Sequence, residues 1–271
     1  MGLKKIRKYC NSIYSEVYEK IDAEEKQAQK EAIKSALFCG IKKFPNVEVA
    51  DIWRAIYETQ VHRKSGIDDA EIIAKVISAD QSWKKSSGHA FEEFIKSLGN
   101  SKLNNFGIEI LLQRDLNELI NQNQLDNEQR DINWIKEQIR ASIFDLYAVL
   151  NTKTGKKLCY GCIQSKTSIR DRVTRDREPS IKAMQNFFWS TIIVLDGAFL
   201  RLPKFKAMIN GGTTEYTENG WHALYVFSEQ YSEDRIYPTD INLKYFTEHA
   251  LQAANYWLKN RQWFNENWRA D

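Results

Sequence analysis

The sequence has no long apolar run. Its longest apolar stretch, residues 190–199, is interrupted by Asp196 and is shorter than the roughly 20 residues that a membrane-spanning helix needs. Residues 1–10 carry four basic side chains with no apolar stretch behind them, which is not the pattern of a secretory signal. We therefore expect no membrane segment and a location in the cytoplasm.

Cysteine and histidine are scarce, with four of each. Cys159 and Cys162 have the C-x-x-C spacing, but a structural zinc site needs about four ligands, and no second such pair stands nearby. Residues three apart on a strand also point to opposite faces. We therefore expect these two, together with Cys10 and Cys39, to be core thiols rather than metal ligands.

The composition is that of an ordinary globular protein. Hydrophobic residues make up 42% and charged residues 28% of the 271 residues, which allows one sizeable core with a smaller accessory lobe. The formal net charge of +3 fits a DNA-binding surface balanced by acidic patches, but also many proteins that bind no nucleic acid. The distribution of charge is therefore more informative than its sum.

The N-terminal part of the chain predicts helices. Apolar residues recur at helical spacing from Leu3 to about Ala79, with breaks at Pro45 and at residues 64–66. Residues 83–88 then precede another expected helix, 89–98. We place the domain boundary before it, so that a helical N-terminal lobe spans residues 1–79 and a second domain spans residues 80–271.

The second domain mixes strands with helices. Its expected strands are 143–150, 158–166, 191–195, 205–209 and 222–227, the first two joined as a hairpin. Its expected helices are 132–140, one that begins at Pro179, and 243–268. A polar connector is expected over residues 117–130. This order predicts an α/β fold with a mixed sheet flanked by helices.

The hairpin carries residues with the chemistry to cut a phosphodiester. Asp145 lies in an otherwise apolar strand, and Lys166 lies on the next strand, two residues after Gln164 and so on the same face as Gln164. Phosphodiester hydrolysis needs a cation, a carboxylate to hold it and an activated water, and Mg²⁺ binds through few carboxylates. We expect Asp145 to hold Mg²⁺ and Lys166 to position the water.

These residues resemble the PD-(D/E)xK nuclease superfamily, in which a strand acid is followed on the next strand by an acid, one residue and a lysine. The chain departs from this pattern, because Gln164 stands at the second acid. Restriction endonucleases of the CCGG/CCWGG group show a matching departure, with the second acid on a helix downstream of the lysine. The resemblance implies a PD-(D/E)xK restriction-endonuclease-like core, with Glu178 as the second catalytic, metal-binding acid.

An arginine-rich segment follows Lys166. In the CCGG/CCWGG group the recognition residues form an R-(D/E)-R element just after the lysine, which corresponds to Arg170, Asp171 and Arg172. Arginine can donate two hydrogen bonds to guanine, and a carboxylate can accept one from cytosine, so the triplet suits adjacent G·C pairs. The alternative is a solvated loop whose charges pair with one another. The candidates for phosphate or additional DNA contacts are Arg175, Arg177 and Lys182.

The likeness to one member of this group extends through residues 87–94 and 164–172 and the helical N-terminal lobe. It implies a CCGG target flanked by A or T. In these enzymes a glutamate on an N-terminal helix approaches the metal region, which makes Glu92 or Glu93 a candidate catalytic helper. Either glutamate could equally be an exposed helix charge.

The sequence therefore predicts a type II restriction endonuclease that hydrolyses double-stranded DNA at a CCGG-containing site with Mg²⁺ and leaves 5′-phosphate ends. A homodimer on DNA is expected, because a two-fold symmetric target matches a two-fold protein, and a cognate DNA methyltransferase is expected in the host. Two alternatives stay open. One is a structure-specific repair nuclease on the same scaffold, and the other is a sequence-specific DNA-binding protein without catalysis.

Other conspicuous residues are expected to serve the fold. His89, His222 and His249 are scattered, and this chemistry needs no histidine. Residues 210–213 contain a Gly-Gly pair that favours a turn between strands. The aromatic residues within 256–268 are spaced as on a helix, which favours core or dimer packing over the stacking of bases.

Overall fold

The computed structural model describes residues 3–21, 25–65, 70–168 and 173–270. The chain divides into two compact units, Met1–Phe94 and Ile95–Asp271. The division falls inside one helix, α4 (Ala70–Leu103). The boundary expected at residue 79 falls inside the same helix, so a single continuous helix belongs to both units.

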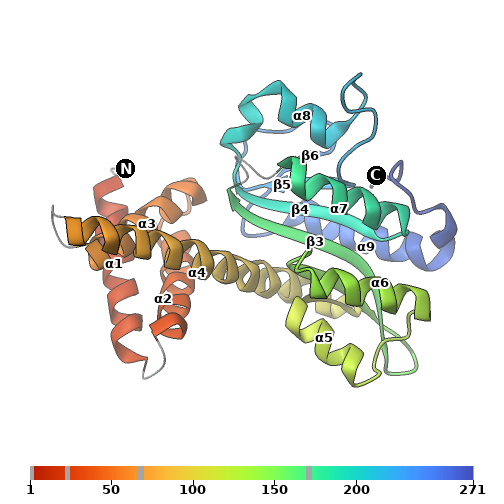
Figure 1. The fold of residues 1–271 in the computed structure, drawn as a ribbon, viewed down its shortest axis with the longest axis horizontal. Helices are drawn as coiled ribbons and strands as arrows, with labels where there is room; N and C mark the ends of the chain where they lie inside the picture. Colours follow the sequence, from red (N-terminus) through yellow and green to blue (C-terminus); the bar gives the residue numbers. More distant parts are fainter. Residues whose placement is uncertain (1–2, 22–24, 66–69, 169–172, 271) are drawn as a thin grey trace. The chain divides into compact units, whose positions relative to one another are not determined.

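The described part of the first unit is mainly helical, which confirms the predicted helical lobe (Figure 1). Three helices precede α4: α1 (Leu3–Lys20), α2 (Glu25–Lys43) and α3 (Val49–Ser65). α1 contacts both α2 and α3. Tyr14, Leu37 and Ile56 are completely buried between these helices, and the ring of Trp53 packs edge-on against Trp83.

α4 is longer than the sequence predicts. The helix expected over residues 89–98 begins at Ala70 and continues through Gly88 to Leu103. Glycine inside a helix costs about 1 kcal/mol relative to alanine, whereas burying one large apolar side chain stabilises by about 1.5–3 kcal/mol. Phe91 and Phe94, which follow directly, are completely buried. Even this long helix, like the others in the described ranges, has no apolar segment that could span a bilayer.

The second unit contains a six-stranded mixed sheet within its described residues, and the strands follow chain order across it (Figure 1). The strands are β1 (Ile108–Leu112), β2 (Leu146–Asn151), β3 (Lys157–Ser168), β4 (Trp189–Asp196), β5 (Ala223–Val226) and β6 (Ile236–Pro238). β1, β2 and β3 pair antiparallel, and β3 to β6 pair parallel. This arrangement confirms the predicted fold class.

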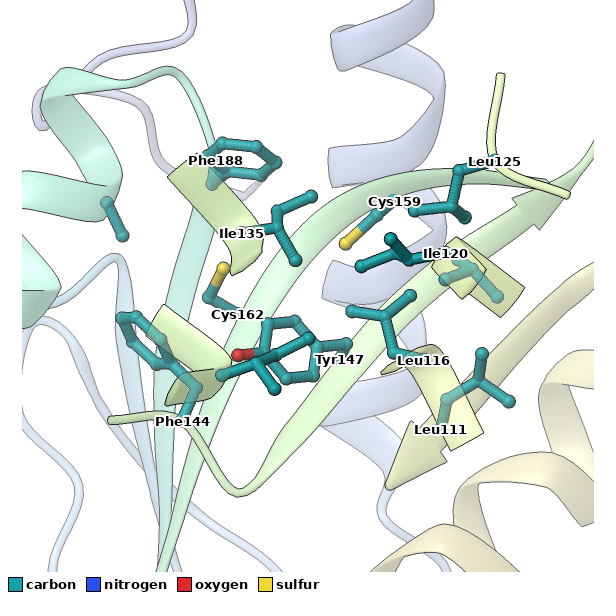
Figure 2. Packing of buried hydrophobic residues seen from close by; sticks show 13 residues of the cluster. Leu111, Leu116, Ile120, Leu125, Ile135, Phe144, Tyr147, Cys159, Cys162 and Phe188 are labelled. Atoms are coloured by element: carbon teal, nitrogen blue, oxygen red, sulfur yellow. The ribbon is translucent and has the colours of Figure 1, made fainter. Parts of the chain in front are cut away.

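Helices cover both faces of the sheet. The helices on one face are α5 (Gln113–Asn121), α6 (Gln129–Arg140), α7 (Val173–Gln185) and α8 (Pro203–Asn210). They bury two apolar clusters against the strands, one around Tyr147 (Figure 2) and one around Trp221. The opposite face is covered by α9 (Lys244–Asn260), where the ring of Trp189 packs between those of Tyr160 and Phe246.

Several predicted elements are wrong. Residues 205–209 belong to helix α8 rather than to a strand, and this helix has Pro203 at its first turn, where proline is favoured. Part of the expected connector, residues 117–121, is the end of α5, because Leu116 and Ile120 lie one turn apart and are both buried. Strands β1 and β6 have no predicted counterpart.

The last helix ends at Asn260 rather than at residue 268. The tail then turns back onto the sheet, where the guanidinium of Arg235 donates to the carbonyl oxygen of Trp268 at 2.9 Å. Nε2 of His222 lies 2.8 Å from the carbonyl oxygen of Asn265. These long-range bonds stop the helix, although the aromatic spacing of the tail is helical.

Cys159 and Cys162 lie on the same face of β3, contrary to the expectation of opposite faces (Figure 2). The reason is a bulge: Ala148 pairs with Gly161 and Val149 pairs with Cys159, so that Tyr160 is an extra residue in the ladder. Both thiols, like that of Cys10, are completely buried, which confirms them as core residues. Cys39 is only half-buried.

Candidate active site

Asp145 lies at the entry to β2. It directly precedes the strand rather than lying inside it as predicted. Its N–H nevertheless donates to the carbonyl oxygen of Ile163 on β3 at 3.1 Å, which continues the strand pairing by one residue. Because side chains two apart on an extended chain share a face, Asp145 lies on the face of Tyr147, the one that α5 to α8 cover.

Lys166 on β3 contacts Asp145. Its Nζ lies 2.9 Å from Oδ2 of Asp145, and the same oxygen accepts the N–H of Ser165 at 2.7 Å. The side chains of Lys166 and Asp145 are 17% and 19% exposed, so solvent can reach them. Among the described residues no donor occupies Oδ1 of Asp145. The structure thus brings together the acid and the lysine that the sequence places on adjoining strands.

Gln164 lies on the same face of β3 as Lys166, but its side chain is completely buried. Its Oε1 accepts the indole N–H of Trp221 at 2.8 Å, and its Nε2 donates to the carbonyl oxygen of Asp176 at 3.1 Å. Both ends of the amide are therefore bonded to protein. Trp221 was missed in the sequence, because it lies 57 residues from Gln164 and no local pattern connects the two.

α7 begins at Val173, six residues before the expected start at Pro179, which is inside the helix. Proline in a helix interior removes one backbone hydrogen bond and costs about 3 kcal/mol. Contacts with the rest of the fold hold the helix despite this cost: Val173 is buried in a core cluster, and the Ser180 hydroxyl bonds that of Ser190 on β4 at 2.7 Å.

Glu178 lies on the exposed side of α7. Its carboxylate pairs with Nζ of Lys182, one turn further on, at 2.7 Å, and the two side chains are 73% and 62% exposed. The hydrogen bond from Lys182 holds the pKa of Glu178 below its usual value. In the described ranges no three Asp, Glu, His or Cys side chains are grouped to hold a metal ion. The convergence of Glu178 with Asp145 therefore stays a prediction.

The basic residues of this region differ in their surroundings. Arg170, Asp171 and Arg172 lie outside the described residues. Arg175 is exposed. The guanidinium of Arg177 donates to the carbonyl oxygens of Met208, at 3.0 Å, and Glu218, and it lies 5.4 Å from the ring centre of Tyr216. Arg177 therefore ties α7 to α8 and to the loop after it, while its predicted contact with DNA stays untested.

Glu92 and Glu93 belong to α4 within the first unit. Oε2 of Glu92 lies 3.1 Å from Nδ1 of His89, one turn earlier in the same helix. Glu93 pairs with Nζ of Lys30 on α2 at 3.0 Å. Glu93 thus connects two helices of the lobe, whereas Glu92 makes a contact only within its own helix among those described.

Two histidines are built into the fold, as expected. Nδ1 of His222 accepts the N–H of Ser190 at 3.0 Å, and burial lowers the pKa of His222 to about 3. Nδ1 of His249 lies 2.8 Å from the hydroxyl oxygen of Tyr225, and burial lowers the pKa of His249 to about 4. Both imidazoles are therefore neutral at physiological pH and packed in the core.

The donor atoms at this site fit a hard divalent cation. Oδ1 of Asp145 is an oxygen donor, as is the exposed carboxylate of Glu178, which is predicted to join it, and Mg²⁺ prefers oxygen donors. Among the described residues no cysteine offers a soft thiolate beside Asp145. The nearest cysteine on β3, Cys162, is completely buried in the core, and burial raises its pKa. The residues present therefore favour Mg²⁺ over zinc.

Comparisons with known proteins agree on one family. The sequence profile described as "BsaWI restriction endonuclease type 2" matches residues 124–263. The solved structure of a pre-specific restriction endonuclease BsaWI–DNA complex is 56% identical, covers 98% of both chains and has a TM-score of 0.73. That of a specific restriction endonuclease AgeI–DNA complex is 17% identical, covers 93% of this chain and 91% of the other, and has a TM-score of 0.62, which shows the shared fold. No curated protein matches the chain.

Proposed function

The chain belongs to the BsaWI family of type II restriction endonucleases and is a site-specific deoxyribonuclease, and from this premise we propose that it cuts duplex DNA at CCGG flanked by A or T, with Mg²⁺. The observation that carries the proposal is the 2.9 Å contact between Nζ of Lys166 and Oδ2 of Asp145. A carboxylate at the start of one strand can hold the cation, and a lysine on the adjoining strand can position the water, so the pair suits the hydrolysis of a phosphodiester.

Each residue has a distinct role in this proposal. Mg²⁺ neutralises charge on the scissile phosphate and acidifies water when it is bound. Asp145 would hold the cation through Oδ1, because Lys166 and the Ser165 N–H occupy Oδ2. Glu178 would leave its ion pair with Lys182 and bind the same cation as Asp145. Lys166 would hold the attacking water in line with the scissile bond. The water oxygen would bond to phosphorus while the bond from phosphorus to the 3′ oxygen breaks; the water would lose its proton to solvent, and the 3′ oxygen would take one from solvent. The products carry a 5′-phosphate and a 3′-hydroxyl.

Base recognition is assigned to Arg170, Asp171 and Arg172. Their position supports the assignment, because β3 ends at Ser168 and the triplet follows within two to four residues of that end. Two arginines and one carboxylate match the donors and acceptors of adjacent G·C pairs in the major groove. The exposed Arg175 would contact a phosphate, and Glu92 would assist catalysis.

A CCGG site is two-fold symmetric, so the enzyme would act on it as a homodimer in which each subunit cuts one strand. Such a short site recurs throughout any genome. The host would therefore need a cognate DNA methyltransferase that protects its own sites, and both proteins would work in the cytoplasm, where the host DNA lies.

Short labelled duplexes test this proposal. One carries ACCGGT, a second has G·C pairs in place of the flanking A·T pairs, and a third has GGCC in place of CCGG. We expect rapid cutting of the first duplex alone, with Mg²⁺ and not with EDTA, and new 5′ ends that a phosphatase can dephosphorylate. Equal cutting of all three would indicate a structure-specific repair nuclease. Specific binding of the first without cutting in Mg²⁺ or Mn²⁺ would indicate a DNA-binding protein without catalysis.

A further inference from the structure

Gln164 connects the strand of the candidate active site to the helix beside it. It lies on β3, two residues before Lys166, and accepts the indole N–H of Trp221 while donating to the carbonyl oxygen of Asp176 on α7. Both Gln164 and Trp221 are almost completely buried. Because buried amides are costly to leave unbonded, the two bonds fix the orientation of this side chain.

The bond to Asp176 falls on the weakest turn of α7. Pro179 has no N–H to offer the carbonyl oxygen of Arg175, and its ring crowds that carbonyl. The helix is therefore poorly held by its own ladder just where Glu178 is placed. Gln164 supplies a hydrogen bond to the adjacent carbonyl, from the strand that also carries Lys166.

A carboxylate at position 164 could not make both bonds. It would accept the Trp221 N–H, but it has no hydrogen to donate to the carbonyl oxygen of Asp176, so two oxygens would face each other in a buried space. The amide is thus the side chain that fits between an N–H and a carbonyl: its nitrogen donates to α7, and its oxygen, the atom that could bind a cation, accepts the Trp221 N–H.

We propose that Gln164 is a positioning residue that fixes the first half of α7, and with it Glu178, relative to Lys166 and Asp145. The proposal rests on the function proposed above for the metal-binding acids. It predicts that restoring the superfamily's acid by Gln164→Glu damages the site at a pH at which the new carboxyl is ionised, because the carboxylate cannot donate to the Asp176 carbonyl oxygen on α7. If position 164 were instead a vacant ligand position, the same substitution would strengthen the site.

The test compares Gln164→Glu and Gln164→Met with the wild type. In single-turnover cleavage of the ACCGGT duplex, we expect both variants to cut about 10- to 100-fold more slowly, because small misplacements of catalytic groups have effects of that size. The Mg²⁺ concentration for half-maximal cleavage should rise, while binding of the duplex in Ca²⁺ stays within about threefold. If both variants cleaved the duplex as fast as the wild type, or if Gln164→Glu needed less Mg²⁺ than the wild type, the proposal would be overturned.

Asn127, in the loop before α6, provides a matched control because its side chain bonds to the same strand, β3. Its side-chain amide also makes two bonds, donating to the Cys159 carbonyl oxygen at 2.8 Å and accepting the Cys159 N–H at 2.7 Å, and it is buried. Asn127→Asp removes the donor just as Gln164→Glu does, but at the other end of β3. We expect it to lower the unfolding temperature and to leave the Mg²⁺ dependence of cleavage unchanged.

Hydrogen exchange separates this proposal from the proposed function. Amides of residues 173–185 should exchange faster in Gln164→Met than in the wild type, and should be unaffected in Asn127→Asp, whether or not the protein cuts DNA. Unchanged exchange of α7 in Gln164→Met would refute the positioning role even if the wild type is an active nuclease. Absence of wild-type cleavage together with faster exchange would refute the function alone.

Discussion

Replacing Lys166 with methionine removes the ammonium and keeps most of the side chain's length. The free energy of unfolding should fall only slightly. Lys166 and Asp145 form a charge-assisted hydrogen bond at 2.9 Å, and their side chains are about one-fifth exposed. An exposed ion pair contributes less than about 1 kcal/mol to the free energy of unfolding, and a hydrogen bond to a charged group contributes roughly 1.5–3 kcal/mol. The contribution of this partly exposed pair should lie between the two. We expect the unfolding free energy to fall by about 1 kcal/mol.

The loss for catalysis should be much larger. A group that positions or deprotonates the attacking water contributes about 10²- to 10⁴-fold, which corresponds to roughly 3–5.5 kcal/mol of transition-state stabilisation. Single-turnover cleavage with enzyme in excess over the cognate duplex measures this quantity directly. Binding of the same duplex in Ca²⁺ should persist, because we assign base recognition to Arg170, Asp171 and Arg172 rather than to Lys166.

Lys157 offers a control of the same chemistry on the same strand. Its Nζ lies 2.5 Å from Oε2 of Glu109, and the two side chains are 22% and 27% exposed. Lys157→Met should lower stability about as much as Lys166→Met and leave cleavage unchanged. If Lys166→Met cut within tenfold of the wild type, or if both variants lost activity equally, the assignment of Lys166 to catalysis would be refuted.

Three further substitutions test separate parts of the account. Glu178→Gln should slow cleavage about 10²-fold or more. The melting temperature should not change, because the described partner of Glu178, Lys182, is exposed. If the melting temperature fell together with the activity, Glu178 would have a structural role instead. Arg172→Ala should reduce the discrimination between the cognate site and singly substituted sites by about 1–3 kcal/mol. The ratios of kcat/KM for these sites measure the discrimination, and unchanged ratios would exclude Arg172 from base recognition. Burial lowers the pKa of His222 to about 3 and that of His249 to about 4, so the unfolded chain binds these protons first and stability falls as pH falls from about 6.5. Each histidine should contribute a loss on the order of 2 kcal/mol between pH 7.5 and 5. In urea unfolding the loss should therefore be about 2 kcal/mol smaller in His222→Gln than in the wild type, and an equal loss in both proteins would contradict it.

The core of the site was predictable because it is local in sequence. Asp145 directly precedes the first strand of one hairpin and Lys166 lies on its second strand, and the two-residue period of an extended chain favours one face for both without knowledge of the remaining fold. The helical lobe was predictable for a similar reason, since apolar residues at helical spacing persist over whole helices. Both inferences needed only short stretches of chain.

The errors arose where distant contacts override local pattern. Pro179 is typical of a helix start, yet α7 begins earlier because the fold anchors Val173 and Ser180. Residues 205–209 resemble a strand, but they form a helix, α8, on which Phe205, Met208 and Ile209 pack against the core. The bulge at Tyr160 places both cysteines of β3 on one face, and such an extra residue has no local signal here.

The surroundings of Gln164 illustrate the limit most clearly. The sequence shows that an amide replaces the superfamily's acid, which is equally compatible with a decayed site and with a migrated acid. Only the structure shows that the amide is bonded at both ends, to Trp221 and to Asp176. The replacement therefore has a physical reason that depends on a residue far along the chain.

Digestion of a long, fully sequenced DNA, with Mg²⁺ and in parallel with EDTA, tests the central claim most directly. Mapping of the product ends should give discrete fragments that all end within CCGG flanked by A or T, carry 5′-phosphates and form only with Mg²⁺. Cuts scattered without sequence preference, or intact DNA across a range of Mg²⁺ and salt concentrations, would contradict it.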